Sequence, residues 1–169
     1  GLALLFAQKN GYKLARNDTP DSFKERIMKT MNYEIYTDSG ATLTSEQADE
    51  VGINMISMNY IMDGELYPSY KAGDTSWLKK FYDKLRQGRS VRTTSLNVSE
   101  YVEAFTHALK SGKDMLYISF ASSMSSNYNN SVSAAKELSE LYPDRKIYIF
   151  DSMSGCSGQG LLSYYAAML

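Results

Sequence analysis

Short apolar runs alternate along the chain with longer stretches of helical periodicity. The runs are rich in branched and aromatic side chains, which is typical of β-strands, and they cover residues 33–37, 53–62, 115–120 and 147–150. The helical segments between them end at Gly52, Gly88, Gly112 and Tyr142. Strands that alternate with helices form βαβ units, so we expect an α/β fold with a mostly parallel sheet and helices on both faces.

Individual residues refine these elements. Asp63-Gly64 predicts a two-residue hairpin turn, after which residues 65–67 return along the preceding strand. Ser99 is the expected N-cap of the helix that ends at Gly112. The helix that ends at Gly88 is expected to turn one face inward, made of Trp77, Leu78, Phe81, Tyr82 and Leu85. The inner face expected for the helix that ends at Tyr142 consists of Val132, Ala135, Leu138 and Leu141 or Tyr142.

The two ends of the chain differ from its middle. Residues 1–31 predict two short helices, a lead segment of unknown role that carries no chemical motif. Residues 161–169 form an apolar helical segment after Gly160 with no capping residue, glycine or proline at its end. We therefore expect residues 32–169 to be one α/β domain and the natural protein to continue into a second domain.

Composition excludes several classes of function. The 169 residues carry a net charge of -1, which argues against a dedicated nucleic-acid-binding protein. A single cysteine, Cys156, and a single histidine, His107, exclude an intramolecular disulfide and most zinc sites. The apolar residues 1–7 are too few to span a bilayer and lack the features of a full signal peptide. These observations favour a cytoplasmic protein.

Hydroxyl-bearing residues gather in four loops that follow or flank the predicted strands: Asp38-Ser39, Thr93-Thr94-Ser95, Ser122-Ser123-Met124-Ser125-Ser126 and Asp151-Ser152. Loops after parallel strands lie at one edge of the sheet, where open α/β sheets bind ligands. Hydroxyl groups can hold a carboxylate or a phosphate, but they lack a base with a pKa near neutral. For any single Ser or Thr, local capping of a helix or turn explains the residue equally well.

Two other interpretations use residues of the same loops. Asp38 and Asp151 each end a strand and could act with a metal in a hydrolase or a phosphoryl-transfer domain. The methionines Met124, Met153 and Met168 could line a lipid tunnel beside the hydroxyl groups, although methionines are usually core residues.

Four segments resemble those of the DegV family, in order and at suitable spacing. Residues 36–43 (Y-T-D-S-G-A-T-L) resemble T-D-S-x-A-x-L, and Thr94-Ser95 followed by Ser99 resembles T-S-Q-P-S. Residues 121–128 (A-S-S-M-S-S-N-Y) resemble S-S-x-L-S-G-T-Y, and residues 151–161 resemble D-S…S-x-G-x-G-L. The departures are Leu96-Asn97 for Gln-Pro, Ala121 for the first Ser, and Ser126-Asn127 for Gly-Thr. The resemblance covers residues 32–169.

The resemblance implies the N-terminal domain of a two-domain protein that binds one long-chain fatty acid. Such a protein presents the acyl carboxylate to a partner fatty-acid kinase for phospholipid synthesis. The family residues that hold the carboxylate match Thr94 and Ser122 here. With the nearby hydroxyl groups of Ser95, Ser123 and Ser125 they form the expected ligand-binding set. No catalytic residue, metal or cofactor is implied for this chain, because the partner brings ATP and metal.

Overall fold

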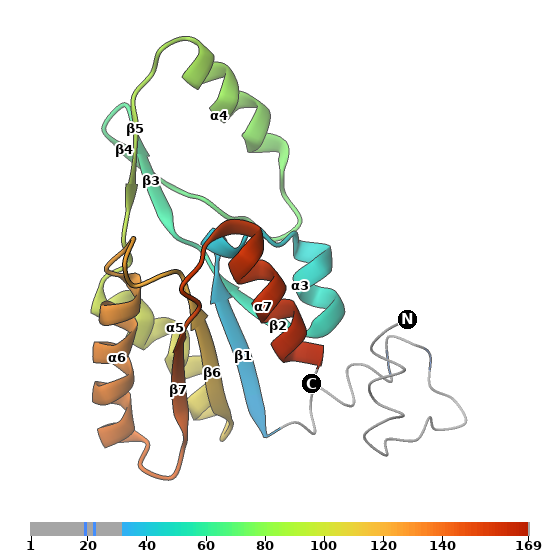
Figure 1. The fold of residues 1–169 in the computed structure, drawn as a ribbon, viewed down its shortest axis with the longest axis vertical. Coiled ribbons are helices and arrows are strands. Elements are labelled where there is room, and N and C mark those ends of the chain that lie inside the picture. Colours follow the sequence, from blue (N-terminus) through green and yellow to red (C-terminus); the bar gives the residue numbers. More distant parts are fainter. Residues whose placement is uncertain (1–18, 20–21, 23–31, 169) are drawn as a thin grey trace.

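The structure, a computed structural model, describes residues 19, 22 and 32–168 (Figure 1). The helices predicted within residues 1–31 lie outside the described residues. In the described part of the chain, no helix is long and apolar enough to cross a membrane.

A four-stranded parallel sheet, called sheet A, forms the centre of the described residues. Its strands lie in the order β2-β1-β6-β7 and are β1 (Tyr33–Asp38), β2 (Ile53–Ile56), β6 (Asp114–Ser119) and β7 (Ile147–Asp151). All of its pairings are parallel, which confirms the predicted sheet. The register pairs Thr37 with Ile118 and Ser119 with Asp151. The carboxyl ends of β1, β6 and β7 therefore lie at one edge.

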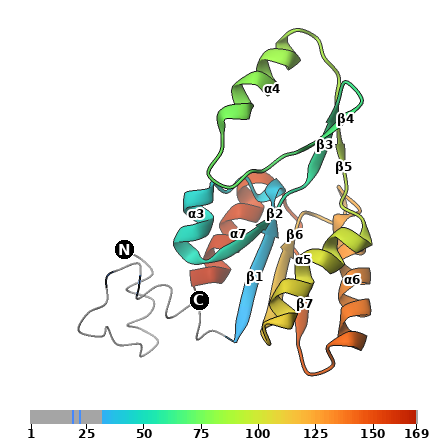
Figure 2. The same cartoon turned by 180° about the vertical axis from the view of Figure 1, so that it is seen from behind.

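Helices cover both faces of sheet A, as the sequence predicts (Figure 2). One face carries α3 (Ser45–Val51) and α7 (Cys156–Met168), and the other carries α5 (Val98–Lys110) and α6 (Asn127–Leu141). Strand side chains alternate between the two layers because successive residues point to opposite faces. Ile35, Ile53 and Ile118 form a core on the side of α3 and α7. Tyr36, Met115 and Tyr117 form a second core with α5 and α6.

A second sheet and one helix form an arm that projects from this body (Figure 1). This antiparallel sheet B has the order β4-β3-β5, with strands β3 (Asn59–Met62), β4 (Glu65–Pro68) and β5 (Val91–Thr94). Asp63 and Gly64 have φ angles of 55° and 86°, which confirms the predicted hairpin turn. The ring of Tyr60 contacts those of Trp77 and Phe81, so α4 (Ser76–Arg86) packs on the Tyr60 face of sheet B.

Sheet B corrects the expected strand over residues 53–62, because Ser57 and Met58 divide that run between two sheets. The Met58 N–H donates to Ser39 Oγ at 2.9 Å, and the Met58 carbonyl accepts from the Ser69 N–H at 2.8 Å. The backbone of Met58 is thus satisfied by loops and not by a strand partner. Thr94, expected in a loop, is the last residue of β5.

The structure also corrects two expectations about helix ends. The N-cap of α5 is Asn97 and not Ser99. Its Oδ1 accepts the Glu100 N–H at 3.0 Å, and Glu100 Oε2 accepts the Asn97 N–H at 2.8 Å, so the two residues form a capping box. Helix α7 begins at Cys156, so Gly158 and Gly160 lie inside it and not before it.

Several apolar side chains expected in the core are exposed. Tyr82 lies about 100° around α4 from Phe81 and so turns away from sheet B. Val132 and Leu141 lie on the outer side of α6, whose buried face consists of Asn127, Ser131, Ala134, Ala135 and Leu138. The strand over residues 147–150 is an edge strand, in which Tyr148 and Phe150 are exposed while Ile147 and Ile149 pack inward.

Candidate functional site

The loops that follow β6 and β7 are joined at the carboxyl edge of sheet A. The Ala121 N–H donates to the Ser154 carbonyl at 2.9 Å, and the Ser152 N–H donates to the Ser119 carbonyl at 3.2 Å. Asp151 Oδ1 accepts the N–H groups of Ser122, at 3.2 Å, and Met153, at 2.9 Å. These bonds place the Ser122 loop directly beside the end of β7.

Asp151 carries a negative charge at neutral pH. Hydrogen bonds from Ser122, and from the Met153 N–H, hold the pKa of its carboxyl below the ordinary value because they favour the charged form. Ser122 and Ser123 are exposed at the same place. A carboxylate therefore lies beside Ser122, a member of the expected ligand-binding set.

The loop after β5 meets the loop after β6 through a pair of serines. The hydroxyl oxygens of Ser95 and Ser125 are 3.2 Å apart and form a hydrogen bond. Thr94 lies one residue before Ser95, is half-buried, and has its Oγ1 3.4 Å from the Asn59 carbonyl oxygen. The structure thus brings together two of the hydroxyl-bearing loops predicted from the sequence, although Thr94 belongs to sheet B and not to sheet A.

Two asparagines of α6 fix this junction, and the sequence did not indicate their role. Asn127 Oδ1 accepts the N–H of Leu96 at 3.0 Å, and Asn130 Nδ2 donates to the Leu96 carbonyl at 2.7 Å. Asn127 is 1% exposed, and its Nδ2 lies 2.9 Å from Met58 Sδ. Asn127 is one of the residues that depart from the family pattern. A polar residue on the buried face of a helix was the signal that could have indicated its role.

A buried polar network lies behind the edge. Asp38 Oδ2 accepts the Tyr117 hydroxyl at 2.6 Å and the Phe120 N–H at 3.2 Å, and Oδ1 accepts the Gly40 N–H at 2.9 Å. The Tyr101 hydroxyl lies 3.0 Å from that of Tyr117 and continues the network. Burial raises the pKa of Asp38, against the opposing effect of these hydrogen bonds, because burial disfavours the charged form.

This network gives Asp38 a structural role. Its side chain is fully buried and its oxygens are occupied by donors of the chain, whereas Asp151 is held at the surface by Ser122 and Met153. Among residues 32–168, no group of three or more His, Cys, Asp or Glu side chains could hold a metal ion. The paired-carboxylate interpretation is therefore not favoured.

Gln159 is a second buried polar residue that the sequence did not indicate. Its Nε2 donates to Thr37 Oγ1 at 3.1 Å and to the Ile118 carbonyl at 3.2 Å, while its Oε1 is buried with no hydrogen-bond partner in the described part of the chain. A Cβ atom added to Gly160 would lie 2.4 Å from the Ala41 carbonyl oxygen. The glycine therefore lets α7 approach the turn after β1 closely enough for Gln159 to reach the sheet.

The remaining candidates are two methionines of the hydroxyl-bearing loops, Met124 and Met153, together with Cys156 and His107. Met124 and Met153 are 60% and 83% exposed, so neither lines a buried tunnel in the described residues. Cys156 is exposed. His107 borders an open groove of about 450 Å³ between α5 and the end of β2, lined by Tyr36, Asn54, Met55, Ile56, Ser57, Glu100, Glu103, Ala104 and His107.

Fold and site together define an α/β protein with a parallel sheet and a projecting antiparallel arm. Between them lies a hydroxyl-lined edge, formed by the loops of residues 95–97, 120–126 and 152–155. Residues 32–169 match the family model described as "Uncharacterised protein, DegV family". A DegV domain-containing protein of Clostridium perfringens is 39% identical over 146 residues, covering 81% of this chain and 47% of that protein. One from Streptococcus pyogenes is 32% identical over 139 residues, covering 81% and 48%. The chain belongs to the DegV family.

Solved structures share the same fold. A DegV protein of Bacillus subtilis superimposes with a TM-score of 0.69 at 23% identity, covering 82% of this chain and 47% of that one. A stearic-acid-binding protein of Eubacterium ventriosum has a TM-score of 0.71 at 22% identity, covering 80% and 46%. A DegV protein of Thermus thermophilus has a TM-score of 0.69 at 17% identity, covering 81% and 46%. The chain spans about half the length of the relatives it matches.

Proposed function

We propose that this chain holds the carboxylate of a long-chain fatty acid at the hydroxyl-lined edge. Thr94 and Ser122 are the principal donors, and Ser95, Ser123 and Ser125 complete the set. The observation that carries the proposal is the Ser95–Ser125 contact, which joins the loops after β5 and β6. Hydroxyl groups that converge in this way can donate several hydrogen bonds to one carboxylate.

The relatives support a fatty acid as the ligand. The Thermus thermophilus and Bacillus subtilis proteins are described as fatty-acid-binding, and the Eubacterium ventriosum protein as stearic-acid-binding. These proteins share the fold of the matched part of this chain, which spans about half of their length. The second half present in the relatives would complete the pocket around the acyl tail.

The protein would act as a carrier and present the acyl carboxylate to a partner fatty-acid kinase for phospholipid synthesis. Asp151 has a lowered pKa and is a weak base at neutral pH, and Asp38 is buried within the network of Tyr117 and Tyr101. Phosphorylation of the acid would therefore depend on groups that the partner brings. Because that partner needs ATP, we place the exchange in the cytoplasm.

Removing single hydroxyl groups tests the binding site. Thr94→Val and Ser122→Ala should each weaken palmitate binding by about 0.5–3 kcal/mol, the effect of losing one hydrogen bond to a charged or buried group. Thr93→Val is the matched control, because Thr93 is the neighbouring residue of β5 and points to the opposite face. Titration with displacement of a fluorescent acyl probe measures the affinities. Equal affinities of all three variants and the wild type would contradict the assignment.

A reconstitution experiment tests the partner. Palmitate, ATP and a bacterial fatty-acid kinase should yield acyl phosphate in the presence of the protein and little without it. The Thr94→Val variant should lower the yield in proportion to its lower occupancy. Acyl phosphate formed at the same rate with and without the protein would refute the presenting role.

A further inference from the structure

The hydroxyl groups of the hydroxyl-lined edge are neutral, so they do not offset the negative charge of Asp151. Asp151 is charged beside Ser122, so a second carboxylate brought to this place is repelled. Residues 95–97, 120–126 and 152–155, which form the loops of the edge, contain no lysine or arginine. A cation that serves an anionic head group must therefore come from a neighbouring element.

Strand β5 carries such a cation on the appropriate face. The register of sheet B pairs Ile61 with Arg92 and Asn59 with Thr94, so Arg92 and Thr94 point to the same face, about 6.8 Å apart along the strand. Tyr60 and Thr93 point to the opposite face, where the rings of α4 pack. The guanidinium of Arg92 thus shares a surface with the hydroxyl group of Thr94.

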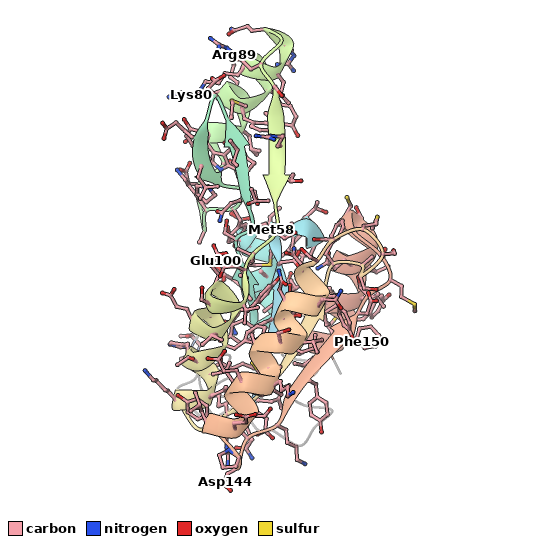
Figure 3. The ribbon with its side chains drawn as sticks, turned by 90° about the vertical axis from the view of Figure 1, so that its left-hand side faces the viewer. Met58, Lys80, Arg89, Glu100, Asp144 and Phe150 are labelled. Carbon is pink, nitrogen blue, oxygen red and sulfur yellow. The ribbon has the colours of Figure 1, made fainter. Side chains whose placement is uncertain are left out.

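The other lysines and arginines of the arm form ion pairs with carboxylates or lie outside β5. Arg89 and Lys84 pair with Asp63 at 3.4 Å and 3.9 Å, and Lys79 and Arg86 pair with Asp83 at 2.7 Å and 2.9 Å. Figure 3 places Arg89 at the tip of the arm, far from Met58 at its base. Lys80 belongs to α4, and Lys71 to the segment that leads into it.

The side chain of Arg92, in contrast, forms no ion pair with a carboxylate among residues 32–168. Its neighbours across the sheet are the apolar side chains of Ile61 and, one strand further, Leu66, which is 60% exposed. Arg92 is exposed, so its guanidinium can reach an incoming anion without first breaking a contact within the chain.

We propose that Arg92 supplies the positive charge that binds the anionic head group of the acyl ligand, next to the hydroxyl group of Thr94. This inference rests on the proposed function and names the residue that selects a charged head group. A guanidinium offers two parallel N–H donors that match a carboxylate, whereas a fatty alcohol offers it no negative charge. Arg92 thereby offsets the repulsion from Asp151, and the acid is preferred over the uncharged alcohol.

The test compares palmitate with the fatty alcohol of the same length. Arg92→Gln should weaken palmitate binding roughly tenfold to a hundredfold and leave the affinity for the alcohol unchanged. Arg92→Lys should retain part of the preference for the acid. Lys80→Gln is the matched control, because it removes the same charge from the same arm on α4. Circular dichroism checks that each variant is folded.

Salt provides an independent measurement. Palmitate affinity of the wild type should fall as ionic strength rises, and that dependence should be weaker in Arg92→Gln. An unchanged ratio of acid to alcohol affinity in Arg92→Gln, or an equal loss in Lys80→Gln, would overturn the role of Arg92. A wild-type protein that binds neither ligand would instead refute the proposed function itself, so the two failures are distinguishable.

Discussion

Asn127 should be the most costly polar side chain to remove from the junction of the hydroxyl loops. In Asn127→Ala the N–H of Leu96 loses its acceptor at 3.0 Å, and Leu96 is only 3% exposed. A buried donor without a partner costs about 1–3 kcal/mol. The lost contact with Met58 Sδ adds little, because a thioether is a weak acceptor. We therefore expect the free energy of unfolding to fall by about 1–3 kcal/mol.

Urea unfolding followed by circular dichroism measures this change. Asn129→Ala is the matched control, because Asn129 is an exposed residue of the same helix and should change stability by less than about 0.5 kcal/mol. Amide hydrogen exchange at Leu96 gives a local readout and should become faster in Asn127→Ala alone. Equal stabilities of the two variants, with unchanged exchange at Leu96, would refute the role given to Asn127.

Two further predictions concern the surroundings of the site. Burial raises the pKa of Asp38 above its unfolded value, so its stabilising contribution is complete below about pH 4 and is lost as pH rises through the folded pKa. Urea unfolding should show the wild type losing stability relative to Asp38→Asn over that rise, and a pH-independent difference would contradict it. Gly160→Ala should destabilise the fold by about 1–3 kcal/mol, because its Cβ would lie 2.4 Å from the Ala41 carbonyl oxygen. Thermal unfolding measures this change beside Ser157→Ala, an exposed control on α7, and equal melting temperatures of the two variants would contradict the prediction.

Much of the architecture follows from local sequence patterns. The alternation of apolar runs with helical periodicity predicts the parallel sheet and the helices on both of its faces. The Asp63-Gly64 turn is also predictable, because two consecutive positive φ angles favour such residues. The convergence of the loops after β6 and β7 follows from topology alone, because parallel strands end at the same edge.

The division of the chain into two sheets was decided by tertiary pairing. Residues 53–62 form one apolar run, and nothing within it marks the change of partner at Met58. Strand β2 pairs with β1, whereas β3 pairs with β4 and β5. Likewise, Tyr148 and Phe150 have the composition of core residues but are exposed on an edge strand.

For the site, the sequence by itself determined which loops carry hydroxyl groups, and the DegV pattern identified Thr94 and Ser122 as its expected centre. Only the tertiary structure decided how those loops are held. Asn127 reaches Leu96 across 31 residues, and Gln159 reaches Thr37 across 122. The register of sheet B also decided which face of β5 carries both Arg92 and Thr94. The sequence pattern around a polar side chain does not specify a distant hydrogen-bond partner. Which of these residues are buried is therefore decided only when the chain folds.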